Sequence, residues 1–383
     1  MAPKPSVCIY RPSENVPQML MNRGERRVGA GAEVRMTILA RSLARRGWPV
    51  SLVAYDYGQP DEVISEDGVR IVKVASTERI RVPVLGFLGR KLPACIRGFH
   101  LADAEIYIVL GPAWYAGVLE HLCRTRGRRL VFWLAHDNDP YVHLPGKTDM
   151  RGPMRWLAAR GLRGADLVIS QTRSQSAAMA SVHHRDSPVV PNIWELTAPD
   201  SPKASPPEVL WAARYMPHKH PERVLQVAAR VPEVSFRMAG GPFSGEQRVL
   251  FDEVRQAARS LPNLEVMGLV PFAEMDQHYA KATAFLCTSD SEGFPNTFLQ
   301  AWNHRTSIVS TFDPDGVLAR EGVGIAARDV DELAQGIRLA CGPAGRAIGQ
   351  RGREHLEAEH SVDAVMSRLE PLLLSSVADV KGA

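Results

Sequence analysis

Two basic side chains in one stretch have the type and position to bind a phosphate group. Arg214 and Lys219 lie in WAARYMPHKHPERV (211–224), where an apolar run passes into a helix whose start is marked by Pro221. A helix N-terminus offers unpaired N–H groups and the positive end of its dipole, so two cations beside it favour a diphosphate. The alternative is a pair of solvated surface cations, and the position after a strand favours the anion site.

A second stretch combines an acid with a side-chain amide. In SEGFPNTFLQAW (291–302), Glu292 precedes a tight turn, and Asn296 or Thr297 is expected to cap a helix that carries Gln300 about one turn inside it. A carboxylate that accepts hydrogen bonds and an amide that donates and accepts both suit sugar hydroxyls. Taken singly, each residue is equally explained by an exposed loop or a polar helix face.

A glycine-rich stretch near the N-terminus is a weaker signal. GAGAEV (29–34) places Gly29 and Gly31 before a helix, where small residues let backbone amides approach an anion or a sugar. The GxGxxG pattern of dinucleotide-binding folds is not matched, because Val34 stands at the third glycine position. Dinucleotide binding is therefore disfavoured.

Other candidate ligand contacts follow predicted strands. His136 ends the run LVFWLAH, where a histidine can bond a hydroxyl, act as an acid or base, or simply cap a turn. Gly240 and Gly241 follow a strand and could line a nucleotide site, although glycine is common at strand ends. Backbone groups near Val270 could contact the base.

Two Asp-x-Asp triplets could suggest a divalent metal. Asp137 and Asp139 form the first, Asp313 and Asp315 the second, and each lies beside a proline in a predicted turn. Aspartate is common in such turns, so we favour the turn interpretation for both. No metal site is predicted.

Composition excludes several classes of protein. The 383 residues suggest two domains, and 45% apolar with 23% charged residues is ordinary for globular proteins. The formal charge of +4 is spread along the chain and is too weak to predict nucleic-acid binding. The five cysteines show no metal-ligand spacing and are interpreted as reduced thiols. With no apolar leader or spanning segment, we expect a cytoplasmic protein.

Short apolar runs alternate with amphipathic stretches, which predicts an α/β protein with buried parallel strands. A proline-rich stretch at 197–208 is the predicted linker between an N-terminal domain (1–196) and a C-terminal domain (209–360), with a final helix at 361–383 that could pack back on the first domain. A helix is expected from Glu33 to Arg46. The predicted strands are Ser6–Tyr10, Pro49–Tyr55, Val69–Val74, Ile106–Leu110, Leu130–Ala135, Leu167–Ser170, Val209–Ala213, Val234–Ala239, Leu264–Val270, Ala284–Thr288 and Ser307–Ser310. Two doubly wound sheets would bind ligands in a cleft at their carboxyl ends.

Together these residues resemble the retaining glycosyltransferases of the GT-B fold, family 4. The resemblance runs from GAGAEVRMTILARSLARRGWPVSLV to SVDAVMSRLEPLL. It implies that Arg214 and Lys219 hold the diphosphate of a nucleotide-sugar donor and that Glu292 contacts the donor sugar. It further implies that Gln300 meets the ribose, that His136 lines the sugar site and that the Gly29–Gly31 loop faces the diphosphate and acceptor.

Two departures from the family pattern affect donor binding. Gln300 stands where the family has a second acid, so the ribose contact keeps its hydrogen bonds and loses a negative charge. Pro295 removes one N–H from a loop whose amides the family directs at the donor, leaving Phe294, Asn296 and Thr297 to supply them.

The resemblance implies a metal-independent hexosyltransferase that moves a sugar from a nucleoside diphosphate sugar to a hydroxyl of a glycan, lipid-linked or small-molecule acceptor, with no cofactor, for example in surface polysaccharide biosynthesis. Closure of the cleft would exclude water. A nucleotide-sugar epimerase of the same fold and a degenerate, non-catalytic binding partner remain as alternatives.

A basic segment, residues 79–99, mixes five cations with apolar residues and could lie on an anionic membrane at the inner membrane surface. An ordinary loop and short helix packed on the N-terminal sheet is the alternative that we favour, because Pro83 and Pro93 interrupt a long amphipathic helix.

Overall fold

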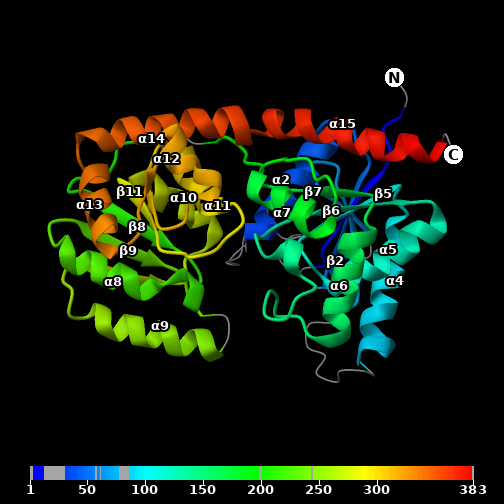
Figure 1. Ribbon diagram of the computed structural model, residues 1–383, viewed down its shortest axis with the longest axis horizontal. Helices are drawn as coiled ribbons and strands as arrows, with labels where there is room; N and C mark the ends of the chain where they lie inside the picture. Colours follow the sequence, from blue (N-terminus) through cyan, green and yellow to red (C-terminus); the bar gives the residue numbers. More distant parts are fainter. Residues whose placement is uncertain are drawn as a thin grey trace. The chain divides into compact units, whose positions relative to one another are not determined.

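The computed structural model describes residues 3–12, 31–56, 58–60, 62–76, 86–197, 201–242 and 245–381. The described chain forms two compact units (Figure 1). Unit 1 contains the residues up to Ile193 and those from Val362 onward, drawn in blue to green and in red, and unit 2 contains the described part of Trp194–Ser361. Gly29 and residues 77–85 lie outside the described chain.

Unit 1 is built on a seven-stranded sheet in the order β3-β4-β2-β1-β5-β6-β7. All neighbouring strands are parallel except β3 and β4. The strands are β1 (Val7–Tyr10), β2 (Val50–Tyr55), β3 (Glu62–Ile64), β4 (Arg70–Val74), β5 (Ile106–Leu110), β6 (Arg129–Trp133) and β7 (Leu167–Ile169). The helices are α2 (Gly31–Arg45), α4 (Leu92–Ala102), α5 (Trp114–Arg126), α6 (Gly152–Gly164), α7 (Arg173–His183) and α15 (Val362–Lys381).

Unit 2 is built on a six-stranded parallel sheet in the order β10-β9-β8-β11-β12-β13. The strands are β8 (Glu208–Ala212), β9 (Ser235–Ala239), β10 (Leu264–Gly268), β11 (Ala284–Cys287), β12 (Ser307–Ser310) and β13 (Ile325–Ala326). The helices are α8 (Pro221–Arg230), α9 (Gly245–Ala258), α10 (Phe272–Lys281), α11 (Asn296–Asn303), α12 (Val317–Glu321), α13 (Val330–Cys341) and α14 (Pro343–His355).

The predicted α/β class with two Rossmann-like sheets is confirmed. Continuous apolar runs such as β5 and β11 are buried along their whole length, as parallel strands covered on both faces must be. Helix α8 turns Val224, Val227 and Ala228 into the core through its helical period and leaves Arg230 exposed. The strands that were not predicted, β3 and β13, are short edge strands whose sequences carry too few apolar residues to show a period.

The C-terminal helix α15 returns to unit 1. The carboxylate of Glu370 accepts hydrogen bonds from Lys4 Nζ at 2.8 Å and from Trp48 Nε1 at 2.6 Å. Partial burial acts to raise the pKa of Glu370, but these two hydrogen bonds outweigh it and lower the pKa below its usual value. These two hydrogen bonds attach helix α15 to Lys4 and Trp48 of unit 1.

The basic segment is helical over its described part. A π-helical turn, η1 (Phe87–Lys91), runs directly into α4, and the Leu92 N–H bonds the Phe87 carbonyl across the wider turn. Pro93 directly follows this wider turn and the helical segment continues through it, so the expectation that it interrupts the helix is wrong.

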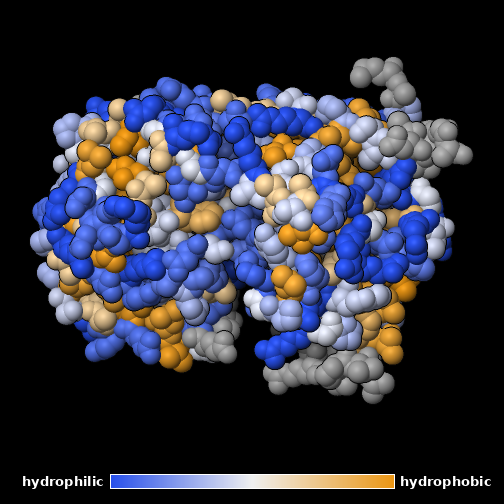
Figure 2. All heavy atoms as spheres, viewed as in Figure 1, coloured by the Kyte–Doolittle hydropathy of each residue, from blue (hydrophilic) through white to orange (hydrophobic). Residues whose placement is uncertain are grey.

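The surface on the face shown in Figure 2 is largely hydrophilic. Figure 2 shows small, separate apolar patches among polar side chains on the face that it presents. Within the described ranges, we find no helix that combines the length and the apolar character needed to cross a bilayer.

Candidate active site

Four loops of unit 2 meet at one edge of its sheet. Strands β10, β9, β8 and β11 are neighbours and all parallel, so the loops that follow them leave from the same, carboxyl edge. Lys219 follows β8, Gly240 follows β9, Val270 follows β10 and Glu292 follows β11. Ligands of open α/β sheets bind at this edge.

A buried hydroxyl joins the loop after β8 to the end of β11. The indole Nε1 of Trp211 donates to Thr288 Oγ1 at 2.9 Å, and that hydroxyl donates to the Lys219 carbonyl at 2.6 Å. Thr288 is fully buried and Trp211 nearly so. The bond from the Asp290 N–H to the His218 carbonyl, at 3.0 Å, ties the same two loops once more. The backbone of Lys219 is therefore held on the strand that leads to Glu292.

Lys219 and Glu292 form an ion pair. The Lys219 ammonium donates to Glu292 Oε1, and the two side chains are only 14% and 17% exposed. Partial burial reduces solvent screening, so the pair is stronger than one on the open surface. The structure thus brings together a cation and an acid that the sequence suggested separately.

A second charged cluster lies beside this pair. Asp290 accepts a hydrogen bond from Arg223 Nη1 at 2.8 Å and is bonded by the His220 imidazole. Partial burial acts to raise the pKa of Asp290, but the bonds from Arg223 and His220 outweigh it and lower the pKa. His220 has a φ of 46°, the left-handed conformation, at the N-cap of α8. Asp290 fixes this residue, which directly follows Lys219.

Arg214 lies in the same loop as Lys219 and is exposed. Among the described residues its side chain has no hydrogen bond or ion pair. The backbone of this loop packs closely against Gly240. The φ of Gly240 is 141°, and a Cβ on this residue would lie 1.9 Å from the Ala213 carbonyl oxygen. Only glycine fits this close approach. At Gly241, the next residue, a Cβ would lie 3.3 Å from the side chain of Leu269, a tight contact that a small shift of this side chain can relieve.

Helix α11 carries the amide that follows the acid. It begins at Asn296, and Pro295 is its N-cap without a side-chain hydrogen bond, so the expected capping by Asn296 or Thr297 is wrong. The first amides of the helix have no carbonyl partner inside it. Gln300 is 7% exposed, and among the described residues its side-chain amide forms no hydrogen bond. The residue is mostly buried, but its amide is open to solvent, where a ligand or water can bond it.

The thiol nearest the ion pair is not poised as a nucleophile. Burial, and after it the negative charge of Glu292, raises the pKa of Cys287. A neutral, buried thiol is inert.

In unit 1, His136 lies in the loop after β6. The strand ends at Trp133, earlier than the predicted Ala135, and the His136 N–H and the Ala135 N–H both donate to Asp139 Oδ2, at 2.9 and 2.6 Å. Gly31 is the first residue of α2, so this helix begins two residues before the predicted Glu33. The sequence assigned Asp139 only to a turn, which agrees with these bonds.

Asp139 and Arg35 are buried charges near this loop. Burial raises the pKa of Asp139 to about 7 against the lowering effect of its two backbone bonds. Burial likewise lowers the pKa of Arg35 to about 9, while the guanidinium stacks 4.1 Å from the centre of the Trp133 ring. The sequence patterns did not predict that Asp139 or Arg35 is buried.

The second Asp triplet is also structural. Asp313 accepts the N–H groups of Leu318, at 2.7 Å, and Ala319, at 3.2 Å, at the start of α12. Across the described ranges no three His, Cys, Asp or Glu side chains converge as metal ligands would.

The sequence did not identify Thr288, Asp290 or His220 as part of this region. Thr288 was expected only as the end of a strand, and its role depends on Trp211, which lies on another strand. A possible signal for Asp290 was its place two residues before Glu292, and for His220 its place directly after Lys219.

Two family models match the chain. "Glycosyltransferase Family 4" matches residues 29–196, and "Glycosyl transferases group 1" matches residues 206–341. Among curated proteins, the D-inositol 3-phosphate glycosyltransferases of Mycobacterium tuberculosis and Mycobacterium bovis are 26% identical over 385 aligned positions, which cover 88% of this chain and 78% of theirs.

Solved structures resemble the whole described fold. Sucrose-phosphate synthase from Thermosynechococcus elongatus has a TM-score of 0.78 at 17% identity, covering 98% of this chain and all of its own. HepE from Anabaena, solved with UDP and glucose, has a TM-score of 0.70 at 15% identity, covering 97% of this chain and all of its own. TarM from S. aureus, solved with fondaparinux, α-GlcNAc-glycerol and UDP, has a TM-score of 0.72 at 10% identity, covering 96% and 99%. With both halves matched by glycosyltransferase models on this two-sheet fold, the chain belongs to the glycosyltransferases of the GT-B fold.

Proposed function

We propose that the protein transfers a sugar from a nucleoside diphosphate sugar to an acceptor hydroxyl with retention of the anomeric configuration, as a family 4 hexosyltransferase. Unit 2 binds the donor and unit 1 the acceptor. The observation that carries the proposal is the Lys219–Glu292 pair at the carboxyl edge of the unit 2 sheet. The loop of Lys219 also holds the exposed Arg214.

In this proposal Arg214 and Lys219 bind the diphosphate. When the glycosidic bond breaks, negative charge grows on the leaving diphosphate, and fixed cations lower the barrier by stabilising that charge. Lys219 is supported for this role because the Thr288 bond fixes its backbone, so little reorganisation is needed. The two cations supply the charge that a divalent metal would otherwise bring, and transfer is expected to persist in EDTA.

Glu292 has two partners in turn. In the free protein it accepts a hydrogen bond from Lys219, and in the donor complex it accepts hydrogen bonds from the sugar hydroxyls while Lys219 turns to the phosphate. Exchange of one anionic partner for another keeps the lysine charge compensated throughout. Attack by the acceptor on the same face as the leaving phosphate needs no covalent enzyme nucleophile, in agreement with the neutral Cys287 thiol.

The nucleotide is bound by the rest of the same edge. The unpartnered amide of Gln300 supports a contact with the ribose, the Gly240–Gly241 turn and the amides of Phe294, Asn296 and Thr297 line the phosphate side, and backbone near Val270 meets the base. For His136, in unit 1, we propose a contact with the donor sugar, and for the loop before Gly31 a contact with the acceptor.

Binding and turnover of a UDP-sugar test the proposal, because HepE and TarM were both solved in complex with UDP. We expect calorimetry to show saturable UDP binding, and NMR of a mixture of UDP-glucose and candidate acceptors to show a product with the α-configuration of the donor. A panel of other nucleoside diphosphates in a thermal-shift assay extends the search to other bases. Failure of every nucleoside diphosphate to bind would overturn the assignment, and a product of inverted configuration would overturn retention.

A further inference from the structure

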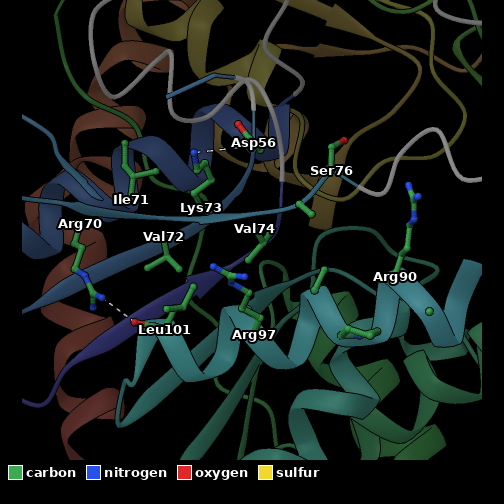
Figure 3. A pocket seen from close by; sticks show the side chains of 14 residues that line it. Asp56, Arg70, Ile71, Val72, Lys73, Val74, Ser76, Arg90, Arg97 and Leu101 are labelled. Carbon is green, nitrogen blue, oxygen red and sulfur yellow. Dashed lines mark hydrogen bonds and ion pairs between the residues drawn. The ribbon is translucent and has the colours of Figure 1, made fainter. Parts of the chain in front are cut away.

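Unit 1 contains a groove that is lined by none of the residues proposed above to contact the donor or the acceptor. It lies between strand β4 and the helical segment formed by η1 and α4, which pack against each other, and its volume is about 690 Å³ (Figure 3). That volume is within the range of ligand pockets. One end is formed by Asp56 and Ser76, just beyond the carboxyl ends of β2 and β4, and the other by Arg70 and Leu101.

The rim of the groove is cationic. Among the described residues, four basic ones line it, Arg70, Lys73, Arg90 and Arg97, against one acid, Asp56. Two of the four are engaged within the protein: Lys73 Nζ lies 3.9 Å from the Asp56 carboxylate and bonds the Gln59 carbonyl at 2.9 Å, and Arg70 bonds the Leu101 carbonyl at 2.8 Å.

The other two cations are available to a ligand. Arg90 and Arg97 are exposed, and neither has an ion pair or a side-chain hydrogen bond among the described residues. They lie seven residues apart on one helical segment, which places them on the same face about 10 Å from each other. Figure 3 shows both side chains extending from that segment on the side of β4.

The floor of the groove is apolar. Val72 and Val74 of β4 and Ala94 of α4 line it, and Leu101, 39% exposed, continues it. None of its described lining residues is aromatic, so they offer no stacking surface of the kind with which proteins hold nucleic-acid bases. Apolar floor and cationic rim together match a molecule that is apolar along one part and anionic at another.

We propose that this groove binds an anionic amphiphile, a phosphate group carried on an alkyl chain, with the chain on the Val72–Val74–Ala94 floor and the phosphate on Arg90 and Arg97. The inference rests on the proposed function in one respect: the bound molecule is the anchor of a lipid-linked acceptor. Because the groove opens at the carboxyl edge of the sheet, its occupant reaches the edge where unit 1 is proposed to receive an acceptor.

Dodecyl phosphate, below its micellar concentration, is the probe. Calorimetry on the full chain is expected to show saturable binding that weakens tenfold or more in Arg90→Glu/Arg97→Glu and in Ala94→Phe, which fills the floor and leaves the charges in place. Arg126→Glu, an exposed arginine of α5 outside the groove, is the matched control and is expected to bind as the unaltered chain does. UDP binding by the same samples reports that each variant is folded and tests the donor site separately.

Three results would overturn the inference. If inorganic phosphate bound as tightly as dodecyl phosphate, the apolar floor would contribute no binding of the alkyl chain. If uncharged dodecyl maltoside bound as tightly as dodecyl phosphate, Arg90 and Arg97 would give no preference for an anionic head group. Sedimentation with phosphatidylglycerol vesicles that is unchanged by Ala94→Phe, with no binding of dodecyl phosphate, would assign the basic rim to a membrane surface. Loss of UDP binding alone would count against the proposed function and leave the groove intact.

Discussion

Lys219 donates a hydrogen bond to the carboxylate of Glu292 although 73 positions separate them in the chain. Each follows one of two adjacent parallel strands, β8 and β11, and the buried Thr288 hydroxyl links the two loops. In the free protein the residue proposed to bind the phosphate and the residue proposed to bind the sugar are therefore held next to each other.

Breaking the pair from either side is expected to have opposite effects on nucleotide binding. Lys219→Ala removes a charge-assisted phosphate contact and should weaken UDP binding by about 1.5–3 kcal/mol, roughly 10- to 100-fold. Glu292→Gln removes the competitor for Lys219, so UDP should bind as tightly or more tightly while the transfer rate falls. Calorimetry and initial rates measure both.

Arg230→Ala is the matched control for loss of a cation, because Arg230 pairs with Asp331 on the solvent side of α8. It should alter neither UDP binding nor transfer. If Lys219→Ala and Glu292→Gln weakened UDP binding equally, the proposal that Lys219 exchanges Glu292 for the phosphate would be contradicted.

Thr288→Val is expected to loosen the loop of Lys219. The substitution leaves the Trp211 indole N–H and the Lys219 carbonyl without their partner, which costs about 1–3 kcal/mol of unfolding free energy. Urea denaturation measures the stability loss, and calorimetry should show weaker UDP binding. Thr288→Ser keeps the hydroxyl and should restore both, whereas a Ser variant as impaired as Val would argue that packing of the methyl group matters instead.

Gly240→Ala should be far more harmful than Gly241→Ala. At Gly240 the added methyl would overlap the Ala213 carbonyl in a backbone conformation that alanine rarely adopts, at an expected cost of about 3 kcal/mol. At Gly241 it would only press on the side chain of Leu269, which is half exposed and can move. Thermal unfolding and UDP affinity compare the two, and similar losses would show that the close approach to the Arg214 loop is unimportant.

Gln300→Glu restores the acid of the family pattern and is expected to tighten UDP binding several-fold. Its carboxylate would accept bonds from ribose hydroxyls, and charge-assisted bonds are stronger than those of the amide. The free protein should lose about 1 kcal/mol of stability, because the new charge is buried without a partner. Gln300→Ala should weaken UDP binding, and unchanged affinity in both variants would remove Gln300 from the ribose site.

The raised pKa of Asp139 predicts a pH dependence of stability. Between its ordinary pKa of 3.8 and about 7, the unfolded chain has released this proton and the folded chain still holds it, so the contribution of Asp139 to stability falls as pH rises through this window. The full effect is at most about 4 kcal/mol. Asp139→Asn keeps an oxygen for the Ala135 and His136 amides and cannot ionise.

The variant should therefore gain stability relative to the unaltered chain as pH goes from 4 to 7.5, measured by urea denaturation at each pH. A constant difference over that range would mean that Asp139 titrates near its ordinary pKa in the folded protein.

The sequence alone determined the class of fold and most strands, because their continuous apolar runs carry a local signal that needs no tertiary contact. It also proposed Arg214, Lys219 and Glu292 as ligand groups, since each stands at a strand-to-helix junction, and Gln300, since it lies about one turn inside the helix that follows Glu292. Local pattern could not find β3, an edge strand of three residues whose pairing with β4 depends on sheet order.

Only the tertiary structure decided which of these residues meet. The order of strands brings Lys219 to Glu292. Packing leaves Gln300 mostly buried, with no side-chain hydrogen bond to another described residue, and makes Asp139 a buried acid. The groove between β4 and α4 likewise joins cations from separate segments. The physical reason is that periodicity is a property of neighbours in the chain, whereas burial, charge pairing and cavities arise between residues distant in sequence.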